Sequence, residues 1–158
     1  MLYIIILLII IFDQVIKLIV TNTLSYGQSV VVINEIFHLT YVRNRGAGFG
    51  ILQGQRTLFI IITIIIIIVL YLYRQRTEKN RYLDIAMALI IGGAIGNLID
   101  RIRLHYVIDY LDFRIWPVFN LADSAVVVGV GILLIYLWKY DDNTGDTGDM
   151  TLEDDKNV

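Results

Sequence analysis

One stretch decides how the chain is organised: Val107-Ile-Asp-Tyr-Leu-Asp-Phe-Arg-Ile-Trp-Pro-Val-Phe-Asn-Leu-Ala-Asp-Ser124. It contains three carboxylates, Asp109, Asp112 and Asp123, around the only proline, and it leads directly into a long apolar segment that is typical of a membrane span. Placing an ionised carboxylate in hydrocarbon costs roughly 2.5–3.5 kcal/mol even on lenient insertion scales. Acidic side chains at a membrane boundary therefore indicate a functional site, and the rest of the chain must supply their partners.

The composition is that of an integral membrane protein. The 158 residues are 57% hydrophobic and 18% charged, whereas soluble domains contain about 45–50% apolar residues. The chain has no cysteine, which excludes disulfides, thiolate nucleophiles and cysteine-bound metals. The two histidines, His38 and His105, occur in no metal-ligand spacing, so we expect neither a metal nor another cofactor. We also find no sequence feature typical of proteins that bind nucleic acids.

Four apolar segments are long enough to cross a bilayer at about 1.5 Å per residue. We expect spans over about residues 1–20, 57–73, 82–101 and 119–139. The first segment lacks the basic start and the cleavage site of a secretory signal peptide, so we interpret it as a retained span. In the third span, the small residues Gly92-Gly93-Ala94-Ile95-Gly96 permit close helix approach.

These spans define a single membrane domain, residues 1–140, followed by a tail at 141–158 that is rich in aspartate. We expect the tail to be disordered because it is acidic and poor in apolar residues. Between the first two spans, β-branched runs at Val30–Ile33 and Ile36–Val42 predict a small strand pair outside the bilayer core. The fold class is therefore an all-α membrane protein with four transmembrane helices and a small strand region.

An even number of spans places both termini on one side of the membrane and the two long connections, 21–56 and 102–118, on the other. The basic cluster in Arg74–Arg81 predicts that the short loop and both termini are cytoplasmic. Six arginines on the opposite side weaken this charge asymmetry: Arg43, Arg45, Arg56, Arg101, Arg103 and Arg114. With either orientation, the polar residues near the span ends converge at one face: Asp13, Lys17, Asn97, Asp100, Arg101, Asn120 and Asp123.

Asp109 and Asp123 have the properties of a catalytic pair. Two carboxylates held close together do not both ionise readily, so they can share a proton, and one can act as a base toward water while the other donates to a carbonyl oxygen. Aspartic proteases use such a pair on an unrelated architecture. The 14 residues of separation include Pro117, which is consistent with a loop that returns to the start of a helix. For Asp112 we expect only solvation of this loop.

Other interpretations of the polar residues remain open. Asp13 and Lys17 are four residues apart, so they can form an intramembrane ion pair that neutralises itself or that shapes the site. Asp100 and Arg101 can pair at a helix end, and Ser124 with Lys17 could form a nucleophile and its base. A small proton- or ion-coupled transporter would also carry intramembrane acids, although such proteins often contain repeats. A third alternative is a scaffold subunit, in which these polar residues would be inert.

Five segments then occur in a recognisable order: Asp13-Gln14-x-x-Lys17, Asn44-x-Gly46-Ala47-x-Phe49, Gly92-Gly93-Ala94-x-Gly96-Asn97-x-x-Asp100-Arg101, Val107-x-Asp109-Tyr110 and Phe119-Asn120-Leu121-Ala122-Asp123-Ser124. Together they resemble the motifs of signal peptidase II, the bacterial lipoprotein signal peptidase family. The resemblance implies a multi-pass aspartyl endopeptidase of the bacterial cytoplasmic membrane, with an extracytoplasmic β-rich cradle. It also implies cleavage of prolipoproteins on the amino side of a diacylglyceryl-modified cysteine, at the outer face of the cytoplasmic membrane.

The same resemblance implies roles for individual residues. Asp109 and Asp123 match the catalytic pair of the family. Gly48 and Tyr110 depart from its pattern, since alanine and phenylalanine are commoner there. The implied partners are prolipoproteins and membrane lipids, without nucleic acid, metal or cofactor. The remaining matches are residues that line the site or hold substrate, Asn44, Asn97, Arg101 and Asn120, and residues that support it, Asp13, Lys17 and Asp100.

Overall fold

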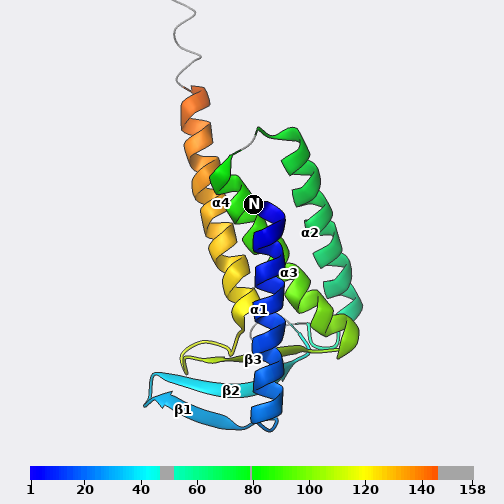
Figure 1. Ribbon diagram of the computed structural model, residues 1–158, viewed down its shortest axis with the longest axis vertical. Helices are drawn as coiled ribbons and strands as arrows, with labels where there is room; N and C mark the ends of the chain where they lie inside the picture. The colour runs from blue at the N-terminus through cyan, green and yellow to red at the C-terminus, as the bar shows by residue number, and fades with distance from the viewer. Residues whose placement is uncertain (47–51, 79, 146–158) are drawn as a thin grey trace, which may run out of the picture.

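Four helices lie side by side and a small sheet closes one end of the bundle (Figure 1). The computed structural model describes residues 1–46, 52–78 and 80–145, the last six without their side chains. The helices are α1 (Leu2–Thr23), α2 (Arg56–Arg76), α3 (Arg81–Arg103) and α4 (Leu121–Gly145). Each contains a stretch long and apolar enough to span a membrane, which confirms the four-span membrane architecture expected from the sequence.

The helices begin and end within a few residues of the expected spans, except at the C-terminal end of α4. This helix continues to Gly145, so the first residues of the expected tail are helical. The remainder of the tail lies outside the described residues. In Figure 1 the N-terminus, the α2–α3 connection and the far end of α4 lie at the end of the bundle away from the sheet, as four spans require.

α3 is the central helix of the bundle, and it packs against α1, α2 and α4. Glycines allow this close packing, because a Cβ atom at Gly93 would collide with the carbonyl oxygen of Ala122 in α4. A Cβ atom at Gly96 would lie 2.6 Å from Oδ2 of Asp13 in α1. Small residues thus bring three helix backbones together, as is common in membrane interfaces.

Polar contacts fix the ends of α2 and α3. The Asn80 side chain precedes α3 and accepts hydrogen bonds from two backbone N–H groups of its first turn, at 2.9 and 3.3 Å. At the same end of the bundle, Arg74 Nε lies 2.6 Å from Asp84 Oδ1 and joins α2 to α3. At the other end, Arg56 Nε donates to the carbonyl oxygen of Arg101 at 2.7 Å. These contacts satisfy helix-end groups that have no partner within their own helix.

The sheet is antiparallel and contains β1 (Ser29–Ile33), β2 (Phe37–Asn44) and β3 (Val107–Asp112) in that order. The hairpin of β1 and β2 agrees with the strand pair expected from the two β-branched runs. The third strand was not expected, because residues 102–118 were interpreted only as a long connection between two spans. This segment is a strand because it pairs with β2 through Val42 opposite Asp109 and Asn44 opposite Val107.

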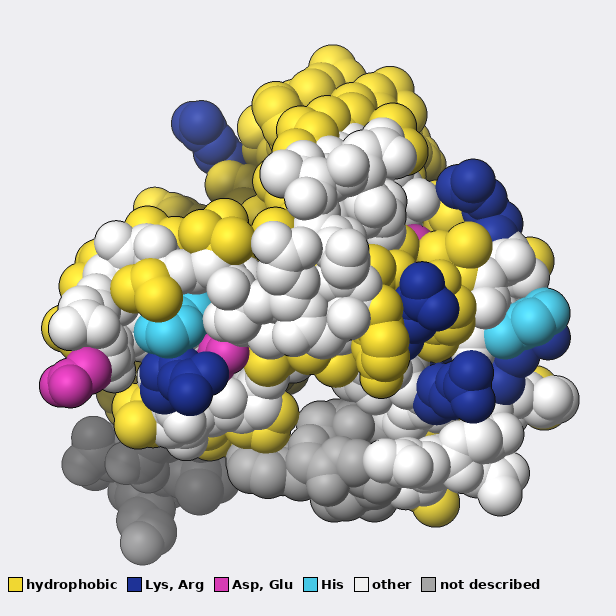
Figure 2. All heavy atoms as spheres, turned by 90° about the horizontal axis from the view of Figure 1, so that it is seen from below, with side chains coloured by type: hydrophobic (Ala, Val, Ile, Leu, Met, Phe, Trp, Pro, Cys, Tyr) yellow, Lys and Arg dark blue, Asp and Glu magenta, His cyan; other side chains and the backbone are white. Residues whose placement is uncertain are grey.

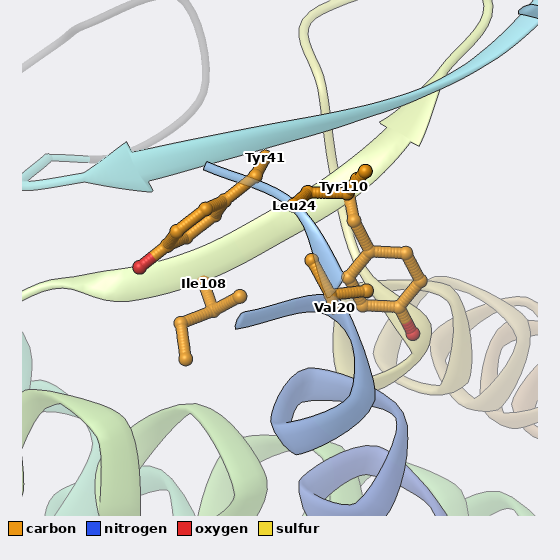
Figure 3. Packing of buried hydrophobic residues seen from close by; sticks show 5 residues of the cluster. All are labelled: Val20, Leu24, Tyr41, Ile108 and Tyr110. Atoms are coloured by element: carbon orange, nitrogen blue, oxygen red, sulfur yellow. The ribbon is translucent and has the colours of Figure 1, made fainter. Parts of the chain in front are cut away.

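The alternation of side chains along β3 separates an apolar face from a polar one. Ile108 and Tyr110 join Val20, Leu24 and Tyr41 in a buried cluster between the end of α1 and the sheet (Figure 3). Asp109, the residue between them, points to the opposite side of the sheet, where Asn44 and Asn120 donate hydrogen bonds to it. Apolar packing against α1 therefore fixes the direction in which the acidic side chain of β3 points.

Candidate active site

Asp123 is positioned by the start of α4. Its backbone N–H donates to Asn120 Oδ1 at 2.9 Å, and its Oδ2 accepts from the backbone N–H of Asn120 at 3.2 Å. This reciprocal arrangement is a capping box, with Asn120 as the helix cap and Asp123 three residues later. The sequence Asn-Leu-Ala-Asp thus starts the helix and places its acid in the first turn, where the helix dipole favours negative charge.

Asp109 is brought to the same place by β3. Its side chain is almost completely buried, and it accepts hydrogen bonds from Asn44 Nδ2 at 2.9 Å and from Asn120 Nδ2 at 2.7 Å. Burial and, to a lesser extent, the negative charge of Asp123 raise the pKa of Asp109 to about 7, although the hydrogen bonds from Asn44 and Asn120 oppose the rise. A carboxylic acid with such a pKa is poised to hold or release a proton near neutral pH.

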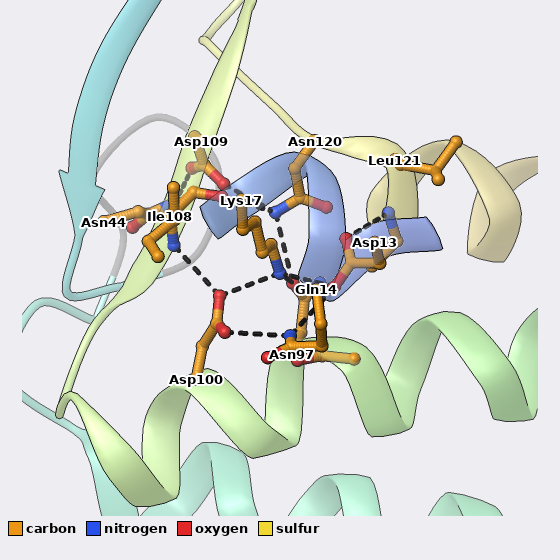
Figure 4. Close-up of polar contacts among 12 residues, drawn as sticks. Asp13, Gln14, Lys17, Asn44, Asn97, Asp100, Ile108, Asp109, Asn120 and Leu121 are labelled. Atoms are coloured by element: carbon orange, nitrogen blue, oxygen red, sulfur yellow. Dashed lines mark hydrogen bonds and ion pairs between the residues drawn. The ribbon is translucent and has the colours of Figure 1, made fainter. Parts of the chain in front are cut away.

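A pair of amides connects the two acids. Asn97 Nδ2 donates to Asp123 Oδ1 at 2.7 Å, and Asn97 Oδ1 accepts from Asn120 Nδ2 at 3.1 Å. Since Asn120 Nδ2 also donates to Asp109, a continuous hydrogen-bonded path runs between the carboxylates through two asparagines. Figure 4 shows the part of this path that runs from Asp109 through Asn120 to Asn97. Among the residues that the structure describes, neither acid forms a salt bridge, so amide groups hold both of them.

Lys17 binds Asn97, one of the two asparagines in this path. Its Nζ lies 2.9 Å from Asp13 Oδ2, 2.8 Å from Asp100 Oδ2 and 3.0 Å from Asn97 Oδ1 (Figure 4). The ion pair of Asp13 with Lys17 is therefore present as expected, and Asp100 is a second acidic partner that the sequence did not indicate. Because Lys17 can only donate, it requires the oxygen of the Asn97 amide to face it, and the amide nitrogen then faces Asp123.

Asp13 and Asp100, the two acids bound to Lys17, also accept hydrogen bonds from backbone N–H groups of other elements. Asp13 Oδ1 accepts from the backbone N–H of Ala122 in α4 at 3.1 Å, and Asp100 Oδ2 accepts from that of Ile108 in β3 at 3.1 Å. Gln14, which we did not assign to the site, donates to Asp100 Oδ1 at 3.1 Å. A polar glutamine inside an apolar span is a sequence feature from which a role in the site could have been predicted. The buried cluster thereby ties α1 and α3 to the elements that carry the two site acids.

A cavity of about 190 Å³ opens beside the pair and is lined by both Asp109 and Asp123. Asn44 and Arg101 also line it, so four of the residues expected in the site share one space. The guanidinium carbon of Arg101 lies 4.9 Å from the centre of the Phe59 ring, which holds this cation at the cavity. The other lining residues, to which the sequence analysis gave no role in the site, are Gly46, Val107 and the apolar wall Trp116, Pro117, Val118 and Phe119.

The apolar wall belongs to a loop that returns to β3. The backbone N–H of Phe119 donates to the carbonyl oxygen of Leu111 at 3.1 Å, and the backbone N–H of Leu111 donates to the carbonyl oxygen of Phe119 at 2.8 Å. This closure brings the start of α4 next to β3, although the sequence places Asp109 and Asp123 on different elements. The expected motif residues Ala47, Gly48 and Phe49 lie outside the described residues.

Asp112 stands apart from the pair. It is buried on β3 and does not solvate a loop, so that expectation was wrong. Burial raises its pKa, but hydrogen bonds from Thr40 and from the backbone and side chain of Arg114 outweigh this and lower the pKa below its ordinary value. The distances are 2.7 Å from Thr40 Oγ1 and 3.0 Å from the Arg114 backbone N–H. These contacts give Asp112 a structural role in the sheet and its turn.

The alternative nucleophile pair is not formed. The Ser124 hydroxyl donates to the carbonyl oxygen of Asn120 at 3.0 Å, while the ammonium of Lys17 is held by two carboxylates. The Ser124 hydroxyl and the Lys17 ammonium therefore each contact other groups, and no hydrogen bond between the two is recorded among the described residues. Within the residues that the structure describes, no three His, Asp or Glu side chains come together in a way that could hold a metal ion.

Comparisons with known proteins identify the family of the chain. The family model for signal peptidase (SPase) II matches residues 5–139. Two similar relatives are called lipoprotein signal peptidase. That of Halothermothrix orenii is 53% identical over 88% of this chain and 96% of the relative, and that of Clostridioides difficile is 46% identical over 87% and 95%.

Solved structures give the same result. A bacterial membrane enzyme determined by the in meso method at 2.3 Å resolution is 40% identical, covers 90% of both chains and superposes with a TM-score of 0.84. A second bacterial membrane enzyme, determined at 1.9 Å, is 40% identical with a TM-score of 0.78, over 86% of this chain and 91% of that one. The matched residues extend from the first span into the last, and the chain belongs to the signal peptidase II family.

Proposed function

We propose that this chain is an aspartyl endopeptidase that removes the signal peptide from diacylglyceryl-modified prolipoproteins at the outer face of the cytoplasmic membrane. The observation that carries the proposal is that Asp109 and Asp123 line one cavity and are joined through Asn97 and Asn120. The lipoprotein signal peptidases to which the chain is similar support the substrate class.

In the proposed mechanism, the Asp109 and Asp123 pair holds one proton. The ionised member takes a proton from water as the water oxygen attacks the scissile carbonyl carbon, and the protonated member donates its proton to the carbonyl oxygen. The tetrahedral intermediate then collapses: one aspartate gives its proton to the leaving amine, the C–N bond breaks, and the other aspartate takes a proton from a hydroxyl of the intermediate, so that the pair again holds one proton. Because the two acids interact, the proton belongs to the pair and the base is not assigned to one aspartate.

Arg101 and Asn44 provide the remaining polar groups of the cavity. Arg101 donates to carbonyl oxygens of the bound peptide, a role suited to its fixed position over Phe59. Asn44 positions Asp109, since its Nδ2 donates to Asp109 at 2.9 Å while its Oδ1 accepts from the backbone N–H of Gly46 at 2.9 Å. We assign it to holding Asp109 rather than to binding substrate directly.

The position of the cavity fits a substrate anchored in the membrane. It lies between the sheet and the ends of α3 and α4, where a cleavage site next to a signal helix and acyl chains would emerge from the bilayer. A transporter would instead need its acids on a path through the membrane. The two acids of the cavity lie at one end of the bundle, which favours the peptidase.

The test is cleavage of a purified prolipoprotein, with and without its diacylglyceryl group, by the wild type and by Asp109→Asn, Asp123→Asn and Asp112→Asn. We expect the wild type to cut only the lipidated form. Asp109→Asn and Asp123→Asn should each lose at least about 100-fold in turnover, since general acid–base catalysis contributes about 10²–10⁴-fold. Asp112→Asn removes the same charge from β3 and should keep turnover within about threefold.

The proposal fails if a folded Asp109→Asn or Asp123→Asn variant cleaves at a rate near that of the wild type. Indifference of the wild type to the lipid group would contradict the substrate class but leave the aspartate pair intact.

A further inference from the structure

A second and larger cavity lies behind the sheet, on the side away from the two catalytic acids. Its volume is about 650 Å³, within the range of small-molecule sites. The ends of α1 and α3 form one side of it, and Tyr41, Arg43 and Tyr106 form the other. Ile108 lines this cavity while Asp109 lines the smaller one, so β3 separates the two spaces.

Arg43 is held at this cavity by three tyrosines. Its guanidinium carbon lies 5.0 Å from the centre of the Tyr26 ring, 5.5 Å from that of Tyr41 and 5.2 Å from that of Tyr106. Its Nε also donates to the Tyr41 hydroxyl at 3.0 Å. Aromatic faces attract a cation without neutralising it, so the guanidinium is fixed in place and keeps its full charge.

Arg103 supplies a second positive charge at the same cavity. Within the described part of the chain, the structure records no ion pair for Arg43 or Arg103. Asp100 is the only carboxylate among the lining residues, and it is 2% exposed and bound to Lys17. The two arginines are exposed, so the accessible part of the cavity carries uncompensated positive charge, with the acidic cluster buried beneath it.

The remaining lining groups suit a polar headgroup. Thr21, Asn22 and Ser25 at the end of α1 present hydroxyl and amide groups to the cavity. This is the end of an apolar helix long enough to span a membrane, and lipid phosphates lie at the depth where such a span ends. Figure 2, which views the molecule from the sheet end, shows lysine and arginine side chains gathered on one side of this face.

We propose that this cavity binds the phosphodiester of an acidic membrane phospholipid, of the phosphatidylglycerol class. Arg43 and Arg103 donate to the phosphate oxygens, for which guanidinium groups are well matched. The hydroxyl groups of Thr21 and Ser25 and the amide group of Asn22 form hydrogen bonds with the glycerol of the headgroup. A quaternary ammonium headgroup would be repelled by the two arginines. This site is separate from the peptidase cavity, and its existence does not depend on the proposed function.

Native mass spectrometry of the detergent-purified chain tests this directly, with phosphatidylglycerol and phosphatidylcholine of identical acyl chains as probes. We expect phosphatidylglycerol to bind the wild type and Arg103→Gln to weaken this binding about tenfold, the value of one charged hydrogen bond. Arg43→Lys keeps the charge but loses the planar contacts, and it should weaken binding by a similar factor. Arg81→Gln removes one positive charge at the opposite end of the bundle and should leave binding unchanged.

Soluble glycerophosphoglycerol distinguishes a membrane lipid from a free phosphate. Competition only at far higher concentration than the lipid supports a lipid site, whereas equally tight binding of the soluble compound would overturn the lipid assignment. Equal binding of phosphatidylcholine, or equal losses in Arg103→Gln and Arg81→Gln, would overturn the proposal. Arg103 is exposed, so Arg103→Gln remains informative even if a change at Arg43 disturbs the tyrosine cluster.

Discussion

At the scale of single residues, Asp109 couples the site to pH. Burial and the charge of Asp123 raise its pKa to about 7. An aspartate in an unfolded chain has a pKa of about 3.9. Between these values the folded protein keeps a proton that the unfolded chain has lost. Stability therefore falls as pH rises from about 4 to 7 and changes no further above the folded pKa.

We expect the free energy of unfolding to be lower at pH 8 than at pH 5, by at most about 3 kcal/mol from this residue. Asp109→Asn should remove most of this difference, because the amide does not titrate. Thermal unfolding in detergent at the two pH values measures the effect. Asp112→Asn is the control, because the pKa of Asp112 is lowered and it titrates below this window. A wild-type pH dependence that survives in Asp109→Asn would show that another group causes it.

The proton on the pair should also appear in the rate. As pH rises above about 7, the pair loses the proton that the carbonyl oxygen requires, so cleavage should decline on the alkaline side. The measurement is turnover of a lipidated substrate between pH 5 and 9 under conditions in which the wild type stays folded. A rate that continued to rise up to pH 9 would contradict a shared proton.

Lys17 is the residue whose removal should cost the most stability. Lys17→Met leaves Asp13 and Asp100 buried without their cation, and breaking a buried ion pair in this way costs about 3–5 kcal/mol. Combining it with Asp100→Asn removes one of the unpaired charges and should recover part of the loss. Thermal unfolding in detergent provides the comparison, with Arg81→Met, which removes a cation at an exposed position, as the control. A Lys17→Met variant as stable as this control would show that the cluster is dispensable.

At the scale of elements, the contact between α3 and α4 depends on the absence of a side chain at Gly93. An added Cβ would collide with the carbonyl oxygen of Ala122 and lie 2.9 Å from Val126 Cγ2. We expect Gly93→Ala to destabilise the protein by about 1–3 kcal/mol, as overpacking does. It should also lower activity, because Ala122 lies in the first turn of α4, immediately before Asp123.

Gly131→Ala is the matched control for this prediction. Gly131 is in the same helix pair, on α4, and an added Cβ there meets nothing within 4 Å. Alanine is the better helix former, so this change should be neutral or stabilising by up to about 1 kcal/mol. Parallel thermal unfolding and activity measurements compare the two variants. Equal effects would mean that helix propensity, rather than helix spacing, determines the outcome.

At the scale of the whole molecule, four spans place the sheet and the α2–α3 connection on opposite sides of the membrane. The chain has no cysteine, so a single introduced cysteine reports its own position. We expect an impermeant thiol reagent to label Asn34→Cys, in the β1–β2 turn, in intact spheroplasts. Glu78→Cys, in the α2–α3 connection, should react only after the membrane is opened. The reverse pattern would place the termini outside and contradict the proposed location of the site.

The sequence alone determined the number of spans and much of the chemistry of this protein. Runs of isoleucine and leucine can satisfy their backbone groups in lipid only as helices, so span positions follow from composition with little ambiguity. The β1–β2 hairpin followed from its β-branched runs. The capping pattern of Asn120 with Asp123 and the spacing of Asp13 with Lys17 are local, and the structure places the members of each in contact.

Tertiary structure alone decided how these local pieces meet. β3 exists because Val107–Asp112 pairs with a strand more than sixty positions earlier in the chain, which no local pattern encodes. The second acid on Lys17, the role of Gln14 and the burial of Asp112 depend on contacts between elements distant in sequence. A buried charge must find partners wherever the fold provides them, because it loses the solvation of water. The residues that need such partners can be read from the sequence, whereas the partners themselves are set by helix packing.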